Sequence, residues 1–214
     1  MSADLPYSQA SENNKLAILE VLKRHLASRE SLLEIGGGTG QHAVFFASSF
    51  PNLHWQSSDI AENIDSLNLR ISQSQLVNLP KAIELNVDDV SWSQHSNQSS
   101  ENESSSHVSS PDVIFTANSL HIMSEQSVEN FFKGVKRHLN IGGLVLLYGP
   151  FKYRNEFTTQ SNAQFDLWLK ERNPESGIRD FEKIKALAEA ADLQLIEDNT
   201  MPANNQLLVW SRKE

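Results

Sequence analysis

The sequence predicts an α/β protein whose core is a seven-stranded, mostly parallel sheet with an antiparallel last strand and helices on both faces. Three observations predict this class. Short apolar runs alternate with amphipathic helical stretches along the 214 residues. Glycines are concentrated in 36–40, where the first apolar run turns into a helical stretch. The final two apolar runs are separated by a link too short for a crossover helix, so they must pair antiparallel.

A helix is expected over about residues 9–27, because leucines recur at spacings of three and four from Leu16 to Leu26. A buried strand precedes the glycines, and a helix follows them and ends before Pro51. Strands and helices continue to alternate after it. The elements expected in this half are strand 31–35, helix 40–50, strand 53–58, helix 62–76 and strand 81–87.

About half of the residues from 91 to 110 are serine, and almost none is apolar. Such a segment buries too little surface to offset its ordering entropy, so we expect a flexible surface insert within a single domain of residues 1–214. His95 and His107 lie inside it. Because no other ligand stands at metal-binding spacing, both are interpreted as solvated histidines, and no metal site is expected.

The alternating pattern resumes after the insert. A "NIGG" turn returns the first helix of this half to the sheet, and Asp180 is expected to cap the last helix. The short "TMPANN" link then joins the two antiparallel strands. The elements expected in this half are strand 112–118, helix 124–139, strand 143–149, helices 161–173 and 180–191, and strands 193–199 and 206–212.

Composition excludes several classes of function. There is no cysteine, which rules out disulfides, cysteine zinc sites and thiol catalysis. Eighteen Lys and Arg against 27 Asp and Glu give a net charge of −9, which argues against nucleic acid as a partner. No stretch approaches the roughly 20 apolar residues of a membrane span, and the first residues do not resemble a targeting signal. We expect a soluble, cytoplasmic protein that acts on a small molecule, although a protein partner stays possible.

The glycine segment narrows the choice of ligand. Glu34, Gly36, Gly38 and Gly40 alternate with other residues, and glycine lets the backbone adopt positive φ and approach a ligand closely. The dinucleotide fingerprint G-x-G-x-x-G would need a third glycine where this chain has Gln41. Asp59 follows Gly40 by 19 residues, at the end of the second predicted strand. There it either accepts hydrogen bonds from a ribose diol or caps the next helix.

The acid and alternating glycines resemble motif I of the class I S-adenosylmethionine-dependent methyltransferases, whose Rossmann-like fold also ends in an antiparallel strand. The stretches "LEIGGGTGQHAVFFA", "YGPF", "SNAQFD", "GIRD" and "MPANNQLLVW" are similar, more closely, to a small methyltransferase-like family without a known substrate. Members of that family carry arginine, proline and aspartate where this chain has Asn13, Ala17 and Asn86. The resemblance implies S-adenosylmethionine as cofactor, no metal, and cofactor contacts at Glu34, Gly36, Gly38, Gly40, His42, Asp59, Asn86, Val87 and Asn118.

Residues on neighbouring loops are candidates for catalysis and for substrate binding. Asn118 and His121 follow the fourth predicted strand, and His121 is either a general base or a neutral histidine satisfied by the backbone. The candidates for the substrate pocket are Tyr148, Phe151, Asn162, Asp166, Arg179, Asn204 and Asn205. Each has a structural alternative: the aromatics as core residues, the polar residues as helix caps or turn residues, and Arg179 in an ion pair with Asp180.

The sequence therefore favours a methyltransferase that uses S-adenosylmethionine, releases S-adenosylhomocysteine and acts on an unidentified small molecule. The alternative is a protein-interaction domain or a binding module that holds the cofactor without catalysis, which the departures at Asn13 and Asn86 favour. A nicotinamide-dependent oxidoreductase ranks third, because Gln41 replaces the third glycine of its fingerprint.

Overall fold

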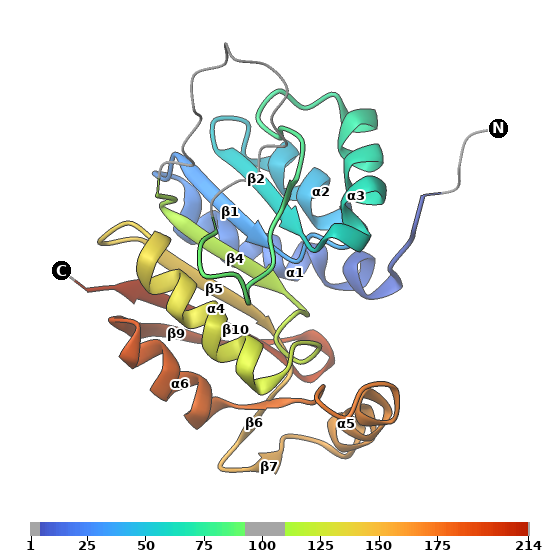
Figure 1. The fold of residues 1–214 in the computed structure, drawn as a ribbon, viewed down its shortest axis with the longest axis vertical. Coiled ribbons are helices and arrows are strands. Elements are labelled where there is room, and N and C mark those ends of the chain that lie inside the picture. Colours follow the sequence, from blue (N-terminus) through green and yellow to red (C-terminus); the bar gives the residue numbers. More distant parts are fainter. Residues whose placement is uncertain (1–4, 93–109, 214) are drawn as a thin grey trace.

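The computed structural model describes residues 5–92 and 110–213 and contains two sheets (Figure 1). The large sheet has seven strands in the order β3-β2-β1-β4-β5-β10-β9, which confirms the predicted number. β10 runs antiparallel to both neighbours, whereas the other pairs of this sheet are parallel. The strands are β1 (Ser31–Ile35), β2 (His54–Asp59), β3 (Ile83–Glu84), β4 (Val113–Ala117), β5 (Leu144–Gly149), β9 (Leu193–Met201) and β10 (Asn205–Arg212).

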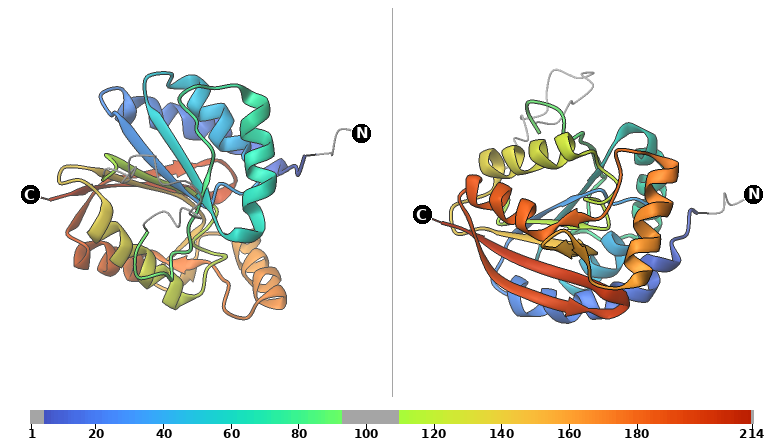
Figure 2. Two further views of the ribbon diagram at one scale, coloured as in Figure 1. Left: turned by 45° about the horizontal axis from the view of Figure 1, so that its top comes forward. Right: turned by 90° about the horizontal axis from the view of Figure 1, so that it is seen from below.

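Helices cover both faces of the large sheet, as the sequence predicts (Figure 2). Successive strand residues point to opposite faces, so Leu32 packs with α1, α2 and α3 while Leu33 packs with α4 and α6. The apolar stripe of α1 differs from the prediction at one position, because Leu16 is 64% exposed and Ile18 is buried. The helices are α1 (Gln9–Leu26), α2 (Gln41–Ser49), α3 (Ala61–Ser74), α4 (Glu125–His138), α5 (Gln160–Arg172) and α6 (Phe181–Ala190).

The parallel strands bring the candidate residues to one edge of the sheet. Ile35 of β1 pairs with Ser58 of β2, and Glu34 pairs with Phe115 of β4. The arrowheads of β1, β2 and β4 point the same way across the molecule (Figure 1). The residues that follow these strands therefore meet at the carboxyl edge, where open parallel sheets bind their ligands.

Two expectations about strands are corrected. The predicted strand 81–87 is only two residues long, Ile83–Glu84, because the chain turns at Asn86, whose Oδ1 accepts the N–H of Asp88 at 3.0 Å. A second, three-stranded sheet was not predicted, since strands this short leave no periodic signal. Its strands are β6 (Phe151–Tyr153), β7 (Glu156–Phe157) and β8 (Arg179–Asp180).

Trp92, which the sequence analysis assigns to the insert, packs against α4. Trp92 is 4% exposed, and its ring stacks on His138 at a centroid distance of 5.4 Å. A Cβ at Gly134 of α4 would lie 2.0 Å from the indole ring, so glycine permits this contact. His95 and His107 lie outside the described residues.

No helix in the described part of the chain is both long enough and apolar enough to cross a membrane.

Candidate active site

A cavity of about 650 Å³ opens at the carboxyl edge of the large sheet. Its volume lies within the range of small-molecule sites. The glycine loop, the ends of β2, β3 and β4 and the first turn of α1 all contribute to its lining. Eight residues singled out from the sequence line it: Gly36, Gly38, His42, Asp59, Asn86, Val87, Asn118 and His121.

The alternating glycines of the loop have the positive φ angles that the sequence analysis expects. Gly36, Gly38 and Gly40 have φ of 74°, 53° and 75°, a region that other L-residues rarely adopt. A Cβ at Gly36 would lie 2.5 Å from the hydroxyl of Ser119, so that side of the loop is packed. At Gly38 no atom lies within 4 Å of the position of a Cβ. The backbone at Gly38 is therefore the part of the loop that a ligand can approach.

Asp59 fastens this loop to the end of β2. Its Oδ2 accepts the N–H of Gly38 at 2.6 Å, and its Oδ1 accepts the N–H of Ile60 at 2.8 Å and the side-chain amide of Asn63 at 2.9 Å. The residue is 7% exposed and lines the cavity. Each carboxylate oxygen has two lone pairs, so Oδ2 retains one acceptor site for a further donor.

Two residues predicted to contact the cofactor lie outside the lining. Glu34 is buried beneath the loop, where its Oε2 accepts hydrogen bonds from Trp55 Nε1 at 3.0 Å and Ser57 Oγ at 2.7 Å. Burial raises the pKa of Glu34, against the opposing effect of these two hydrogen bonds. Gly40 is the N-cap residue of α2, and a Cβ there would meet Leu67 at 2.9 Å. Glu34 and Gly40 therefore support the glycine loop from its packed side and do not line the cavity.

Asn86 lines the cavity, and its side-chain oxygen accepts the N–H of Asp88 and retains one acceptor site. Asp88 also lines the cavity, although the sequence reasoning did not select it. Its carboxylate accepts from Ser127 Oγ at 2.8 Å and Asn130 Nδ2 at 2.9 Å and so ties this turn to α4. Asp88 follows the end of β3 by four residues, and this position was the available signal in the sequence.

His42 links the cavity to α1. It is 6% exposed, and its Nε2 lies 2.7 Å from Asn14 Oδ1. Ser8, Ala10 and Ser11 of the α1 segment line the cavity beside it. This segment is held against the glycine loop by two side chains. Gln41 Oε1 accepts the N–H of Ser8 at 2.6 Å, and Arg70 donates to Thr39 O and Pro6 O, each at 2.5 Å.

His121 is a buried imidazole with no side-chain hydrogen bond to the residues that the structure describes. It is 6% exposed, and its ring meets the ring of Phe165 edge-on at a centroid distance of 5.4 Å. Burial, with a smaller contribution from Arg179, lowers the pKa of His121 to about 4. The imidazole is therefore neutral near pH 7 and can accept or donate a hydrogen bond within the cavity.

The loop 120–123, which carries His121, is anchored through four consecutive carbonyl oxygens. Three residues of the segment after α5 supply the donors. Arg179 Nε donates to Leu120 O at 3.0 Å, Gly177 N to His121 O at 2.9 Å, Ser176 Oγ to Ile122 O at 2.8 Å, and Arg179 Nη2 to Met123 O. The "GIRD" motif therefore fixes the backbone that positions His121.

The predicted substrate-pocket residues are not among the residues that line this cavity. Tyr148 and Phe151 are each 2% exposed in the apolar clusters. Asp166 accepts the N–H of Ile178 at 2.7 Å and the ammonium group of Lys170 at 2.6 Å, so it supports the anchoring segment. The seven candidates outside the lining are Tyr148, Phe151, Asn162, Asp166, Arg179, Asn204 and Asn205.

Asn162, Asn204 and Asn205 make hydrogen bonds in and around the link between β9 and β10. Asn162 Nδ2 donates to Asn204 O at 3.1 Å and joins α5 to the link between β9 and β10. Asn205 Nδ2 donates to Pro202 O at 3.1 Å within that link. Asn204 has a φ of 58°, a conformation that asparagine tolerates better than most residues. The "MPANN" motif thus shapes a turn.

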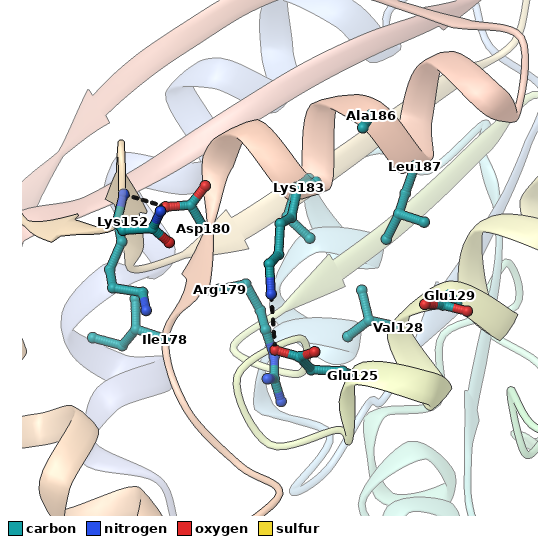
Figure 3. Close-up of a pocket in the computed structure, with 12 residues that line it drawn as sticks. Glu125, Val128, Glu129, Lys152, Ile178, Arg179, Asp180, Lys183, Ala186 and Leu187 are labelled. Carbon is teal, nitrogen blue, oxygen red and sulfur yellow. Dashed lines mark hydrogen bonds and ion pairs between the residues drawn. The ribbon is translucent and has the colours of Figure 1, made fainter.

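A second cavity, of about 310 Å³, lies between α4, α6 and β6 (Figure 3). Its polar groups largely pair with one another. Lys183 lies 3.3 Å from Glu125, and the Asp180 carboxylate accepts the N–H of Asn155 at 2.6 Å. Asp180 is the N-cap residue of α6, as predicted, but its side chain makes no capping bond. Arg179 lines this second cavity while its guanidinium anchors the loop of the first, so it stands between the two.

Acidification is expected to destabilise the protein between about pH 6.5 and 4. Burial lowers the pKa of both His42 and His121 to about 4, from an ordinary value of 6.5. In that window the unfolded chain binds more protons than the folded one, so the free energy of unfolding falls as pH falls. Each histidine contributes a slope of up to about 1.4 kcal/mol per pH unit.

Urea unfolding at several pH values measures this slope. His121→Gln should flatten it, whereas His54→Gln, at an exposed position, should leave it unchanged. An equal slope in the wild type and His121→Gln would contradict the assignment of this effect to His121.

No group of three or more His, Asp or Glu side chains suited to a metal ion occurs in residues 5–92 and 110–213.

Comparison with known proteins places this site in context. A family model described as "Protein of unknown function (DUF938)" matches residues 5–212. An O-methyltransferase family protein from Burkholderia thailandensis has 15% sequence identity and a TM-score of 0.75, with 94% of this chain and 56% of that chain covered. The fold predicted from the sequence, that of class I methyltransferases, is thereby confirmed.

Two further solved structures have this fold. One is an O-methyltransferase family 2 protein from Planctomyces limnophilus in complex with apigenin, with 16% identity, a TM-score of 0.73, and coverage of 96% of this chain and 58% of that chain. The other is human N-acetylserotonin methyltransferase in complex with SAM, with 14% identity, a TM-score of 0.68, and coverage of 94% and 55%. The chain spans little more than half the length of these proteins.

Proposed function

We propose, on the premise that the chain belongs to the DUF938 family, that it is an S-adenosylmethionine-dependent methyltransferase acting on a small molecule. One observation carries the proposal. Two glycines with positive φ, Gly36 and Gly38, line one cavity at the carboxyl edge together with the Asp59 carboxylate and the neutral imidazole of His121, which has no side-chain hydrogen bond in the described chain. A nucleotide-like cofactor beside a reactive centre needs this combination.

The lining residues fit the parts of the cofactor in a definite order. Asp59 would hold the ribose diol through its remaining acceptor site, and the open backbone at Gly38 would let the chain of the cofactor pass close by. Asn86 and Val87 would flank the adenine. His42 and the first turn of α1 would face the methionine portion, where the positive end of the helix favours a carboxylate.

His121 is the proposed base and Asn118 a proposed positioning residue. The cofactor supplies an already activated methyl group, so the protein mainly has to align the acceptor and exclude water. The imidazole of His121, neutral at pH 7, would accept the proton of the acceptor. Asn118 has a φ of 60°, and its N–H donates to Tyr148 O at 2.8 Å, which fixes the start of the loop that carries His121.

A second candidate is a module that binds the cofactor without turnover. Asn86 favours it, because its side-chain oxygen already accepts one hydrogen bond, and a neutral amide oxygen accepts the adenine amino group more weakly than a carboxylate would. Both candidates bind the cofactor, and only the first forms S-adenosylhomocysteine in the presence of an acceptor. We further propose that residues 1–214 form one domain.

Calorimetric titration with S-adenosylhomocysteine tests the shared part of both candidates without knowledge of the substrate. Binding with a micromolar Kd is expected, and NAD, titrated as the control, should bind at least tenfold more weakly. No heat of binding with S-adenosylhomocysteine would overturn the proposed function, and tighter binding of NAD would favour the oxidoreductase.

A further inference from the structure

The acceptor side of the main cavity can be located from the order of the strands, given the proposed function. The large sheet runs β3-β2-β1-β4, and the proposed cofactor residues follow β3, β2 and β1. A cofactor lying across these strand ends brings its reactive end toward β4. The lining that remains for the acceptor comes from the loop after β4 and from α5: His121, Ile122, Met123 and Phe165.

Charge restricts what this part of the cavity can hold. No Lys or Arg side chain stands among the residues that line the cavity, within the described chain. Two carboxylates, Asp59 and Asp88, do line it. A carboxylate or phosphate on the acceptor would therefore lose hydration without gaining a cationic partner. The lining selects against an anionic acceptor.

Phe165 supplies a flat and rigid wall. Its ring stacks on Trp168 at a centroid distance of 5.6 Å and an interplanar angle of 23°. The guanidinium of Arg172 lies 3.6 Å from the centroid of the Trp168 ring. The ring of Phe165 also meets the ring of His121 edge-on. A ring held in this way stays in one orientation, and planar ligands pack well against such a surface.

Ile122 adds an apolar group to the lining on this side. It lines the cavity and is 53% exposed. Trp168, which backs Phe165, is 44% exposed. Exposed apolar groups gathered beside a cavity commonly mark a surface that a ligand covers.

We propose that the methyl acceptor is an uncharged, flat aromatic molecule whose ring packs against Phe165 and whose hydroxyl group hydrogen-bonds to His121. In the reaction the acceptor oxygen forms a bond to the methyl carbon while the carbon–sulfur bond breaks and its electron pair stays on sulfur. The hydroxyl proton passes to the imidazole of His121 and then to water. The acceptor oxygen ends as a neutral ether.

Binding of matched probes to the protein saturated with S-adenosylhomocysteine tests this class of acceptor. The probes are methyl para-hydroxybenzoate, which is neutral, para-hydroxybenzoate, which is anionic at pH 7, and the cyclohexane analogue of the ester, which is not flat. The neutral aromatic ester is expected to bind at least tenfold more tightly than the other two. Equal binding of the anion, equal binding of the cyclohexane analogue, or no binding of the ester would each overturn the proposal.

Two variants of α5 distinguish an effect of the Phe165 ring on ligand binding from an effect of any substitution in this helix. Phe165→Leu should weaken binding of the ester at least fivefold and leave the affinity for S-adenosylhomocysteine unchanged. Leu167→Ala, at a site that is 63% exposed and outside the cavity lining, should change neither. An unchanged affinity of Phe165→Leu for the ester would overturn the role of the wall.

The titration with S-adenosylhomocysteine precedes these measurements and distinguishes the two levels of failure. If it shows no binding, the proposed function fails and this inference fails with it. If the cofactor product binds and the probes are not discriminated, only the assignment of the acceptor fails.

Discussion

Asp59→Ala is expected to weaken the binding of S-adenosylhomocysteine at least tenfold. The substitution removes a carboxylate that would accept from the ribose diol and that already accepts the N–H of Gly38 at 2.6 Å. A hydrogen bond to a charged group contributes roughly 1.5–3 kcal/mol, and about 1.4 kcal/mol corresponds to a tenfold change in affinity. Losing the bond to the ligand alone therefore accounts for the tenfold effect, and loosening of the glycine loop adds to it.

Calorimetry on folded variants measures the change. Asp59→Asn keeps an oxygen that can accept from Gly38, so it should lose less affinity than Asp59→Ala and isolate the part that depends on charge. Asp65→Ala is the matched control, because Asp65 is an exposed acid on α3 outside the cavity lining. Wild-type affinity in a folded Asp59→Ala protein would exclude Asp59 from cofactor binding.

Arg179→Ala is expected to lower the free energy of unfolding by roughly 2–4 kcal/mol. The guanidinium donates to the carbonyl oxygens of Leu120, Met123 and Glu175. Alanine leaves these acceptors without their charged donor in a partly buried region, which costs more than the loss of an exposed contact. The loop that carries His121 should also become mobile, so binding of the neutral aromatic ester should weaken more than binding of S-adenosylhomocysteine.

Urea unfolding and the two titrations measure these effects together. Arg24→Ala is the control. Arg24 donates hydrogen bonds to the side chains of Glu197 and Asn199, but at the surface, where such pairs contribute about 0–1 kcal/mol. Arg179→Lys keeps the charge, but a single ammonium group cannot reach both Leu120 O and Met123 O in the same geometry, so an intermediate loss is expected. Equal stability of Arg179→Ala and Arg24→Ala would contradict the anchoring role.

The sequence by itself determined the elements whose signal is local. Apolar periodicity located the helices and most strands, because burial of one face repeats every two or every 3.6 residues. The alternating glycines located the loop at the end of β1, since only glycine adopts positive φ there at little cost. The short link between β9 and β10 required antiparallel pairing, and Asp59 at a strand end reached the cavity as expected.

Only the tertiary structure decided how the motif residues are used. Arg179 and Leu120 are 59 positions apart, and no periodicity relates them. In the sequence analysis, the "SNAQFD" and "GIRD" stretches are assigned to a substrate pocket. In the structure, Asp166 supports the segment after α5, and Arg179 anchors the loop that carries His121. Phe165 and Asp88, which do line the cavity, gave no strong signal of their own. The physical reason is that a side chain's partner across the fold depends on how whole elements pack, which no local pattern records.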